Sequence, residues 1–103
     1  MKIAIFTNEF PPNIYGGAGV HVDFLSQELA KLGKVEVRCY GDQFEDHDNM
    51  HVRGVETTLM TPEMKDSQRD KMYMNLYRDV EMARATPQAD IVHCHTWYTH
   101  LAG

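Results

Sequence analysis

The sequence predicts an α/β fold, in which helices flank a parallel sheet, and three observations carry this prediction. Residues 2–7 form a short, nearly continuous apolar run, which is typical of a strand covered on both faces. From Val20 to Gly33 the apolar residues recur with the period of a helix. Residues 35–40 then alternate between apolar and polar, which indicates a second strand. This order makes a βαβ unit, whose right-handed crossover places the two strands parallel.

The segment between the first strand and the first helix, residues 8–19, is expected to be irregular. Pro11 and Pro12 fix φ and lack N–H groups, and the glycines after them permit tight backbone turns. The helix that follows is expected to end near Gly33 and to bury one apolar face. The residues expected on that face are Phe24, Leu25, Leu29 and Leu32.

The second half of the chain contains sequence patterns that predict secondary structure with different clarity. Residues 42–49 are acidic and predict a surface loop, residues 51–57 are a weaker strand candidate, and residues 62–67 predict a turn. Residues 67–85 have helical spacing, and residues 89–94 are a short apolar run that predicts a last strand. The apolar stripe of the second helix consists of Met72, Tyr73, Leu76, Tyr77, Val80 and Ala83.

Composition excludes several classes of protein. The chain has 103 residues, of which 43% are hydrophobic and 24% charged, so it is one small folded domain or part of a larger one. A formal charge of −5 argues against nucleic acid as a partner. Cys39 and Cys94 are too few for a disulfide framework, and no run approaches the ~20 apolar residues of a membrane span. The apolar run at the N-terminus is too short for a signal peptide, so the cytoplasm is the expected compartment.

The end of the chain leaves the predicted sheet unfinished. A doubly wound sheet would next place a covering helix after its last strand, and residues 95–103 are too few to complete one. We therefore expect these residues to be the N-terminal part of something larger.

Three glycines, Gly16, Gly17 and Gly19, lie between the first strand and the first helix. Without Cβ atoms they let a ligand approach the backbone, and the first turn of a helix offers unpaired N–H groups that suit a phosphate or a developing negative charge. Their spacing matches neither the dinucleotide-binding fingerprint nor the Walker loop. The alternative is that they serve turn geometry only.

A second cluster crowds the end of the last strand: His93, Cys94, His95, Trp97, Tyr98 and His100. It predicts either a metal site or hydrogen-bonding and stacking groups for a polar ligand such as a sugar; the lack of a compact metal motif favours the ligand, and no metal is expected. The ordinary alternatives are a hydrogen-bonded histidine beside a strand and a tryptophan that packs. If the first and last strands are neighbours across a switch point, the glycines and His95 face one crevice.

Three segments carry a resemblance to a known family. They are residues 2–21 (KIAIFTNEFPPNIYGGAGVH), 37–43 (VRCYGDQ) and 93–103 (HCHTWYTHLAG). Together they resemble family 4 retaining glycosyltransferases of the GT-B fold, in particular glycogen synthases and α-maltose-1-phosphate synthases of the actinobacterial type. The resemblance implies that residues 1–103 are a truncated, Rossmann-like N-terminal domain on the acceptor side, inactive alone, and that a C-terminal nucleotide-binding domain lies outside this chain.

The resemblance also implies an activity of the glycogen- or starch-synthase type. Such a retaining hexosyltransferase moves glucose from ADP-glucose, or UDP-glucose, to an α-1,4-glucan or to glucose 1-phosphate, and it needs no cofactor or metal. Gly16, Gly17 and Gly19 would then lie against the donor diphosphate, with the N–H groups of residues 17–20 stabilising its charge. His95 would be catalytic and would orient the transferred sugar, and Trp97 would be a substrate contact. A non-catalytic sugar- or phosphate-binding module and an inactive fragment remain the alternatives.

Overall fold

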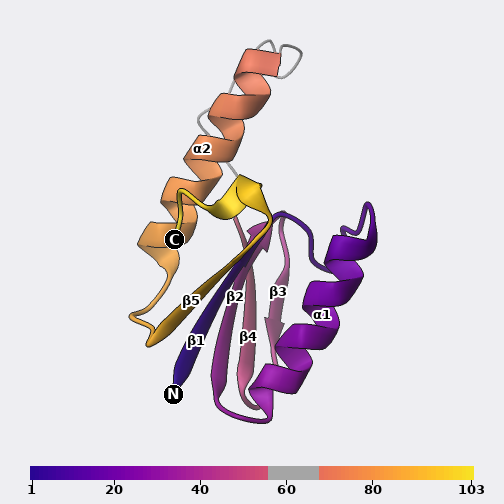
Figure 1. The fold of residues 1–103 in the computed structure, drawn as a ribbon, viewed down its shortest axis with the longest axis vertical. Helices are drawn as coiled ribbons and strands as arrows, with labels where there is room; N and C mark the ends of the chain where they lie inside the picture. Colours follow the sequence, from indigo (N-terminus) through magenta and orange to yellow (C-terminus); the bar gives the residue numbers. More distant parts are fainter. Residues whose placement is uncertain (56–67) are drawn as a thin grey trace.

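A computed structural model describes residues 1–55 and 68–103, which form a five-stranded sheet with one helix against each face (Figure 1). The strand order is β3-β4-β2-β1-β5, and every neighbouring pair is parallel except β3 with β4. In chain order the elements are β1 (Lys2–Thr7), α1 (Gly17–Ala30), β2 (Lys34–Tyr40), β3 (Phe44–Asp46), β4 (Met50–Val55), α2 (Gln68–Ala85), β5 (Ile91–His95) and the short 3₁₀ helix η2 (Trp97–Thr99).

Strand β1 lies between β2 and β5, and its position creates the switch point of the sheet. It pairs with β2 from Lys2↔Lys34 onward and with β5 as far as Thr7↔His95. The strands β2 and β4 follow on one side of β1, and β5 lies on the other. The predicted βαβ unit and the mainly parallel sheet are therefore confirmed, and the first and last strands are neighbours, which is the condition for a shared crevice.

Alternate residues of the strands build two hydrophobic cores. The core under α1 contains Ile3, Ile5, Phe10, Val22, Val35, Val37, Cys39, Met50 and Val52. The smaller core on the other face, toward α2, contains Ala4, Phe6, Val55, Met82 and Ala102. Because both faces of the sheet are covered, the sequence of β1 is a nearly continuous apolar run, as expected for a central strand.

Helix α1 differs from the prediction in its start and in its buried face. It begins at Gly17, so the last part of the segment 8–19 is helical and the expectation of irregular structure there is wrong. Phe24 and Leu32 are 64% and 76% exposed. The buried residues of the helix are instead Gly19, Val22 and Ser26, with Leu29 and Ala30 partly buried against the core. Small residues on this face let the helix lie close to the sheet. The sequence prediction differs because it chose the buried face from the hydrophobicity of the side chains alone.

The acidic segment 42–49 is not entirely a loop. Its residues Phe44–Asp46 form β3, an edge strand antiparallel to β4. The guanidinium of Arg53 lies 3.8 Å from the ring centroid of Phe44 and donates a 2.8 Å hydrogen bond to Asp46. Charged residues suit an edge strand because they discourage pairing with other chains, and this is why their pattern did not predict a strand.

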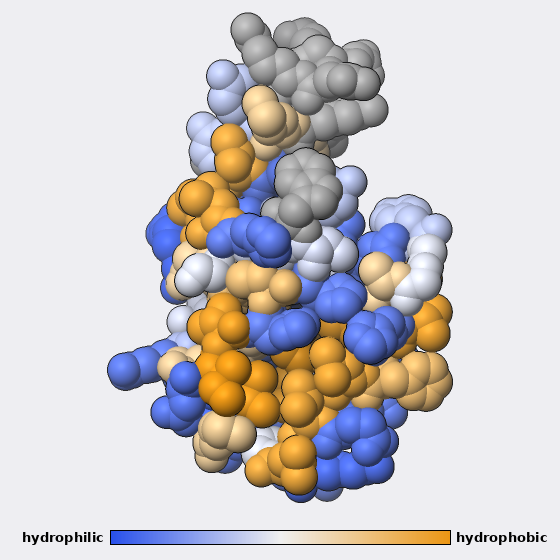
Figure 2. Space-filling view, in the orientation of Figure 1, coloured by the Kyte–Doolittle hydropathy of each residue, from blue (hydrophilic) through white to orange (hydrophobic). Residues whose placement is uncertain are grey.

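Helix α2 presents a different face to the sheet from the one expected. Asp79 and Met82 are buried, and the Tyr40 hydroxyl on β2 donates a 2.8 Å hydrogen bond to Asp79. The predicted apolar stripe is instead exposed on the helix (Figure 2): Met72, Tyr73, Leu76, Tyr77, Val80 and Ala83. Figure 1 shows that the N-terminal half of α2 extends beyond the ends of the strands, so this part of the helix has no sheet to pack against.

The remaining elements agree with the prediction apart from their ends. Strand β4 lies within the candidate 51–57 apart from its first residue, and β5 starts two residues later than expected and includes His95. The predicted turn at 62–67 lies outside the described residues. None of the helices in the described part of the chain is long and apolar enough to cross a membrane.

Candidate functional site

The carboxyl ends of β1 and β5 lie side by side at the switch point of the sheet, which is where the ligand-binding crevice is expected. Thr99 Oγ1 donates a 3.1 Å hydrogen bond to the carbonyl of Phe6, and Thr96 Oγ1 donates one of 3.2 Å to Asn8 Oδ1. The segments that leave the two strands are thus bonded to each other. Thr96 has a φ of 73°, in the left-handed region, so the chain turns sharply directly after His95.

Glu9 connects the end of β1 to the first turn of α1. Its side chain is buried, and its carboxylate accepts hydrogen bonds from the backbone N–H of Tyr15 at 3.1 Å and of Gly19 at 2.8 Å. A carboxylate is favourable at this end of a helix, where N–H groups are unpaired and the dipole is positive. Glu9 is therefore the residue that organises the glycine-rich segment.

The three glycines of this segment have different environments. A Cβ at Gly19 would lie 3.0 Å from Ile14 Cγ1 and 3.1 Å from Glu9 Cβ, so Gly19 permits close packing. Its N–H is bonded to Glu9, and the expectation that this N–H stabilises a ligand is therefore not met. At Gly16 and Gly17 a Cβ would meet nothing within 4 Å. These two glycines leave open space beside the backbone at the start of α1.

Three imidazoles from two elements meet at the crevice. The ring centroids of His21, on α1, and His95, on β5, are 5.2 Å apart with the ring planes tilted by 31°. The rings of His93 and His95 are 5.7 Å apart, and His93 Nε2 lies 3.4 Å from His95 Nδ1. The start of the first helix and the end of the last strand therefore come together, as the sequence predicts.

The surroundings of His95 keep its imidazole neutral. Burial lowers the pKa of His95 below its ordinary 6.5, the charges of His21 and His93 lower it further, and Glu9 partly opposes them. A neutral imidazole both donates and accepts a hydrogen bond. His95 can accordingly hold a hydroxyl group at neutral pH.

Other members of the histidine cluster point elsewhere. Cys94 alternates with its neighbours on β5 and packs against the core on the α2 side, where burial raises the pKa of its thiol. The charge of His100 acts on Asp79 of α2 rather than on His95. Trp97 begins η2, but its side chain lies outside what the structure describes. Within residues 1–55 and 68–103, no group of three His, Cys, Asp or Glu side chains is arranged to hold a metal ion.

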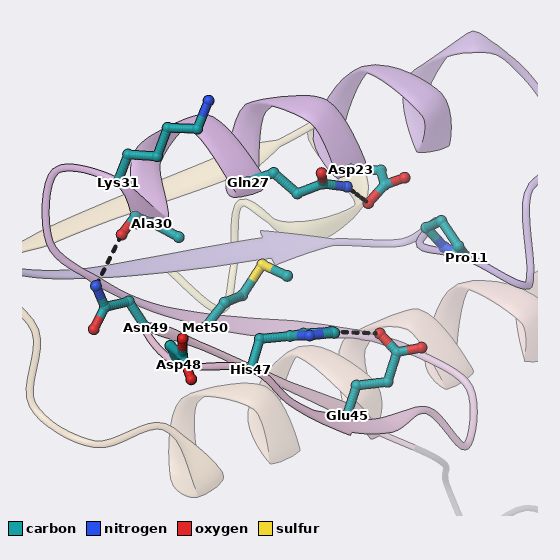
Figure 3. Close-up of a pocket in the computed structure, with 10 residues that line it drawn as sticks. All are labelled: Pro11, Asp23, Gln27, Ala30, Lys31, Glu45, His47, Asp48, Asn49 and Met50. Atoms are coloured by element: carbon teal, nitrogen blue, oxygen red, sulfur yellow. Dashed lines mark hydrogen bonds and ion pairs between the residues drawn. The ribbon is translucent and has the colours of Figure 1, made fainter.

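A cavity of about 680 Å³ lies elsewhere, between α1 and the β3–β4 hairpin (Figure 3). Its polar side chains are engaged with one another: Gln27 donates a 2.9 Å hydrogen bond to Asp23, and His47 Nε2 lies 3.5 Å from Glu45 Oε2. None of the predicted site residues lines this cavity. The switch-point crevice is therefore the better candidate site.

Sequence reasoning missed two residues of the crevice. Glu9 is not among the predicted site residues, yet an acidic residue just before a glycine-rich helix start is a recognisable helix-capping signal. His21 lies one helical turn after Gly17, so it shares the edge of the helix that borders the glycines. That spacing could have identified it.

The chain is similar to known proteins over most or all of its length. The family model described as Glycosyltransferase Family 4 matches residues 15–103. The α-maltose-1-phosphate synthases of Mycolicibacterium smegmatis and Mycobacterium tuberculosis are each 37% identical to the chain, over 100% of its length and 24% of their own. An uncharacterized glycosyltransferase of Methanocaldococcus jannaschii is 30% identical over 100% of the chain and 27% of its own length. The chain thus spans about a quarter of the length of these curated relatives.

Proposed function

Since this chain belongs to glycosyltransferase family 4, we propose that residues 1–103 are the N-terminal, acceptor-side part of a glycosyltransferase of the glycogen- or starch-synthase type. The reaction transfers glucose from ADP-glucose or UDP-glucose to an α-1,4-glucan or to glucose 1-phosphate, with retention of configuration. The 37% identity to α-maltose-1-phosphate synthases supports this choice of substrates. A C-terminal nucleotide-binding domain completes the site, and this chain supplies one wall of it.

The observation that carries the proposal is the meeting of His21 and His95, with ring centroids 5.2 Å apart, at the switch point between β1 and β5. Ligands of open α/β sheets bind outside the carboxyl ends of the strands at such a point. The glycine-rich start of α1 and the end of β5 therefore contribute to the same crevice. Neither motif alone would support an enzyme site.

Each side of the crevice has a proposed role. The N–H groups at the start of α1, beside the open space at Gly16 and Gly17, stabilise the charge that develops on the departing diphosphate. The neutral imidazole of His95 hydrogen-bonds a hydroxyl of the transferred glucose and so orients its anomeric carbon. Trp97, which follows two residues later, is a further proposed sugar contact.

The test is hexosyl transfer by the natural full-length polypeptide. ADP-glucose and UDP-glucose are each offered with maltoheptaose and with glucose 1-phosphate, and the product and its anomeric configuration are read by NMR. We expect transfer with retention, and a His95→Ala variant that stays folded but loses at least about tenfold in turnover, roughly 1.4 kcal/mol of transition-state stabilisation. His47→Ala, in the β3–β4 hairpin that lines the separate cavity, is the matched control. A smaller loss at His95, or no transfer with any pair of substrates, contradicts the proposal.

A further inference from the structure

We infer that His21 is a second ligand-binding residue of the crevice, and that its imidazole binds a phosphate group next to the sugar that His95 is proposed to hold. The inference deepens the proposed function and rests on it for the chemistry of the ligand. It assigns a role to a residue that neither the glycine motif nor the His93–His95 segment includes.

The first argument is the convergence of two rings from different elements. His21 projects from α1 and His95 from the end of β5, and their ring centroids are 5.2 Å apart with a tilt of 31°. A phosphate presents several strong acceptor oxygens, so one of them can accept a hydrogen bond from His21 while His95 meets the adjoining sugar. The side chain of His21 is exposed and that of His95 half-buried, and a ligand can therefore reach the pair from the crevice.

The second argument is the arrangement around His95. His93 Nε2 lies 3.4 Å from His95 Nδ1, which occupies that nitrogen and leaves Nε2 to meet a ligand. Glu9 is the acidic group that acts on the ring, but its two oxygens accept hydrogen bonds from the backbone N–H groups of Tyr15 and Gly19. The carboxylate thus serves the backbone, and the imidazole pair gains its hydrogen-bonding partner from the ligand.

The third argument concerns the proton balance. The groups that face His95 are His21 from α1, His93 from its own strand and Glu9 from the segment after β1. Two imidazoles this close repel each other when both are protonated, and this repulsion lowers the pKa of His95. A bound phosphate, which is an anion, offsets that repulsion, and the pair takes up a proton from solvent as the phosphate binds. Affinity should consequently increase as the pH falls from 8 to 6.

Two ligands present this chemistry, namely the diphosphate of a nucleotide sugar and the phosphate of a sugar phosphate. Isothermal titration calorimetry of the natural full-length polypeptide with ADP, and separately with glucose 1-phosphate, distinguishes them. Each titration is made at pH 6 and pH 8 in two buffers of different ionisation enthalpy, which reports the protons taken up. The variant is His21→Gln, and the control is His47→Gln.

We expect His21→Gln to weaken the binding of one of the two ligands by at least about tenfold, to leave the other within about threefold, and to reduce the proton uptake. His47→Gln should match the wild type in every titration. Wild-type affinity of His21→Gln for both ligands, or an absence of proton uptake by the wild type, overturns the inference.

A second measurement covers the case in which the variant fails to fold. In the wild type, the Cε1–H signal of His21 should shift on addition of the ligand that binds, and an unchanged signal at saturation overturns the inference. The proposed function is judged separately by hexosyl transfer. If the polypeptide transfers no hexose but needs His21 to bind phosphate, only the proposed function is contradicted. If the polypeptide transfers hexose and its His21→Gln variant binds both ligands as tightly as the wild type does, only the inference is contradicted.

Discussion

The carboxylate of Glu9 and the backbone N–H of Gly19 are joined by a 2.8 Å hydrogen bond that spans ten residues of the chain. The bond fixes the distance between the end of β1 and the first turn of α1. It also uses the absence of a side chain at Gly19, because a Cβ there would approach both Glu9 and Ile14. The two residues therefore determine the shape of the glycine-rich side of the crevice.

Replacing Glu9 with Gln should destabilise the protein by about 1–3 kcal/mol, because a buried, charge-assisted hydrogen-bond acceptor for two N–H groups is weakened. Urea unfolding followed by circular dichroism measures the difference. Glu28→Gln is the matched control, since Glu28 is exposed and pairs with the exposed Lys31; it should change stability by less than about 0.5 kcal/mol. Equal effects of the two variants would contradict the role given to Glu9.

Two glycine-to-alanine variants should separate packing from ligand access. Gly19→Ala should destabilise the fold by about 1 kcal/mol or more, because its Cβ would lie 3.0 Å from Ile14 Cγ1. Gly17→Ala should leave stability unchanged or raise it by up to about 1 kcal/mol, because its Cβ meets open space and alanine favours a helix. Gly17→Ala should nonetheless weaken ADP binding, since the added methyl group enters the proposed path of the diphosphate. Thermal unfolding and calorimetry on both variants measure the two effects.

The titration of His95 should respond in opposite directions to its two neighbours. Its NMR midpoint should lie below pH 6.5, Glu9→Gln should lower it further, and His21→Gln should raise it, because the first removes an attractive charge and the second a repulsive one. A folded-state pKa below the unfolded value contributes stability above pH 6.5, and that stability is lost as the pH falls through the folded pKa. His95→Gln should therefore lose less stability than the wild type on acidification. Shifts of the same sign in both neighbour variants would refute this arrangement of charges.

Asp79 should make stability depend on pH in the opposite sense. Burial raises the pKa of Asp79 above its ordinary 3.8, although the hydrogen bond from Tyr40 and the charge of His100 lower it. Since the folded state holds this proton more tightly, its contribution to stability falls as the pH rises above 3.8 through the folded pKa.

Asp79→Asn has no carboxyl group to titrate at this position. Its free energy of unfolding, measured with urea, should therefore increase relative to that of the wild type between about pH 4 and 7. Tyr40→Phe should destabilise the protein at pH 7 by about 1–3 kcal/mol, because the buried carboxylate loses its donor. Tyr77→Phe, on the exposed face of the same helix, is the control for removal of a hydroxyl and should have little effect.

The backbone architecture could be predicted from the sequence because its signals are local. Apolar runs and helical periods identify β1, α1, β2 and β5, and the handedness of the βαβ crossover makes the first pair parallel. The crevice follows from the same reasoning, since parallel neighbours bring their carboxyl ends to one edge. His95 and the glycines were found in this way.

The features that could not be predicted depend on contacts between residues distant in the sequence, or on buried positions that are not occupied by the most hydrophobic side chains. The start of α1 at Gly17 is stabilised by Glu9, and the buried face of the helix is chosen by small residues such as Gly19 and Ser26 rather than by Phe24. Strand β3 exists because β4 offers it an edge to pair with, and its own residues are charged. His21 could not be assigned from the helix pattern alone, because its partner lies on the last strand.

The placement of β1 between β2 and β5 has a consequence for synthesis on the ribosome. One edge of β1 is paired as soon as β2 emerges, but the other waits for a strand near the end of the chain. Asn8 and Thr96, which are hydrogen-bonded to each other, are 88 residues apart. At about 5–20 residues per second this separation corresponds to roughly 4–18 s of elongation. The nascent chain therefore carries an open edge on its first strand for seconds, and the candidate site at the switch point cannot form before β5 has been synthesised.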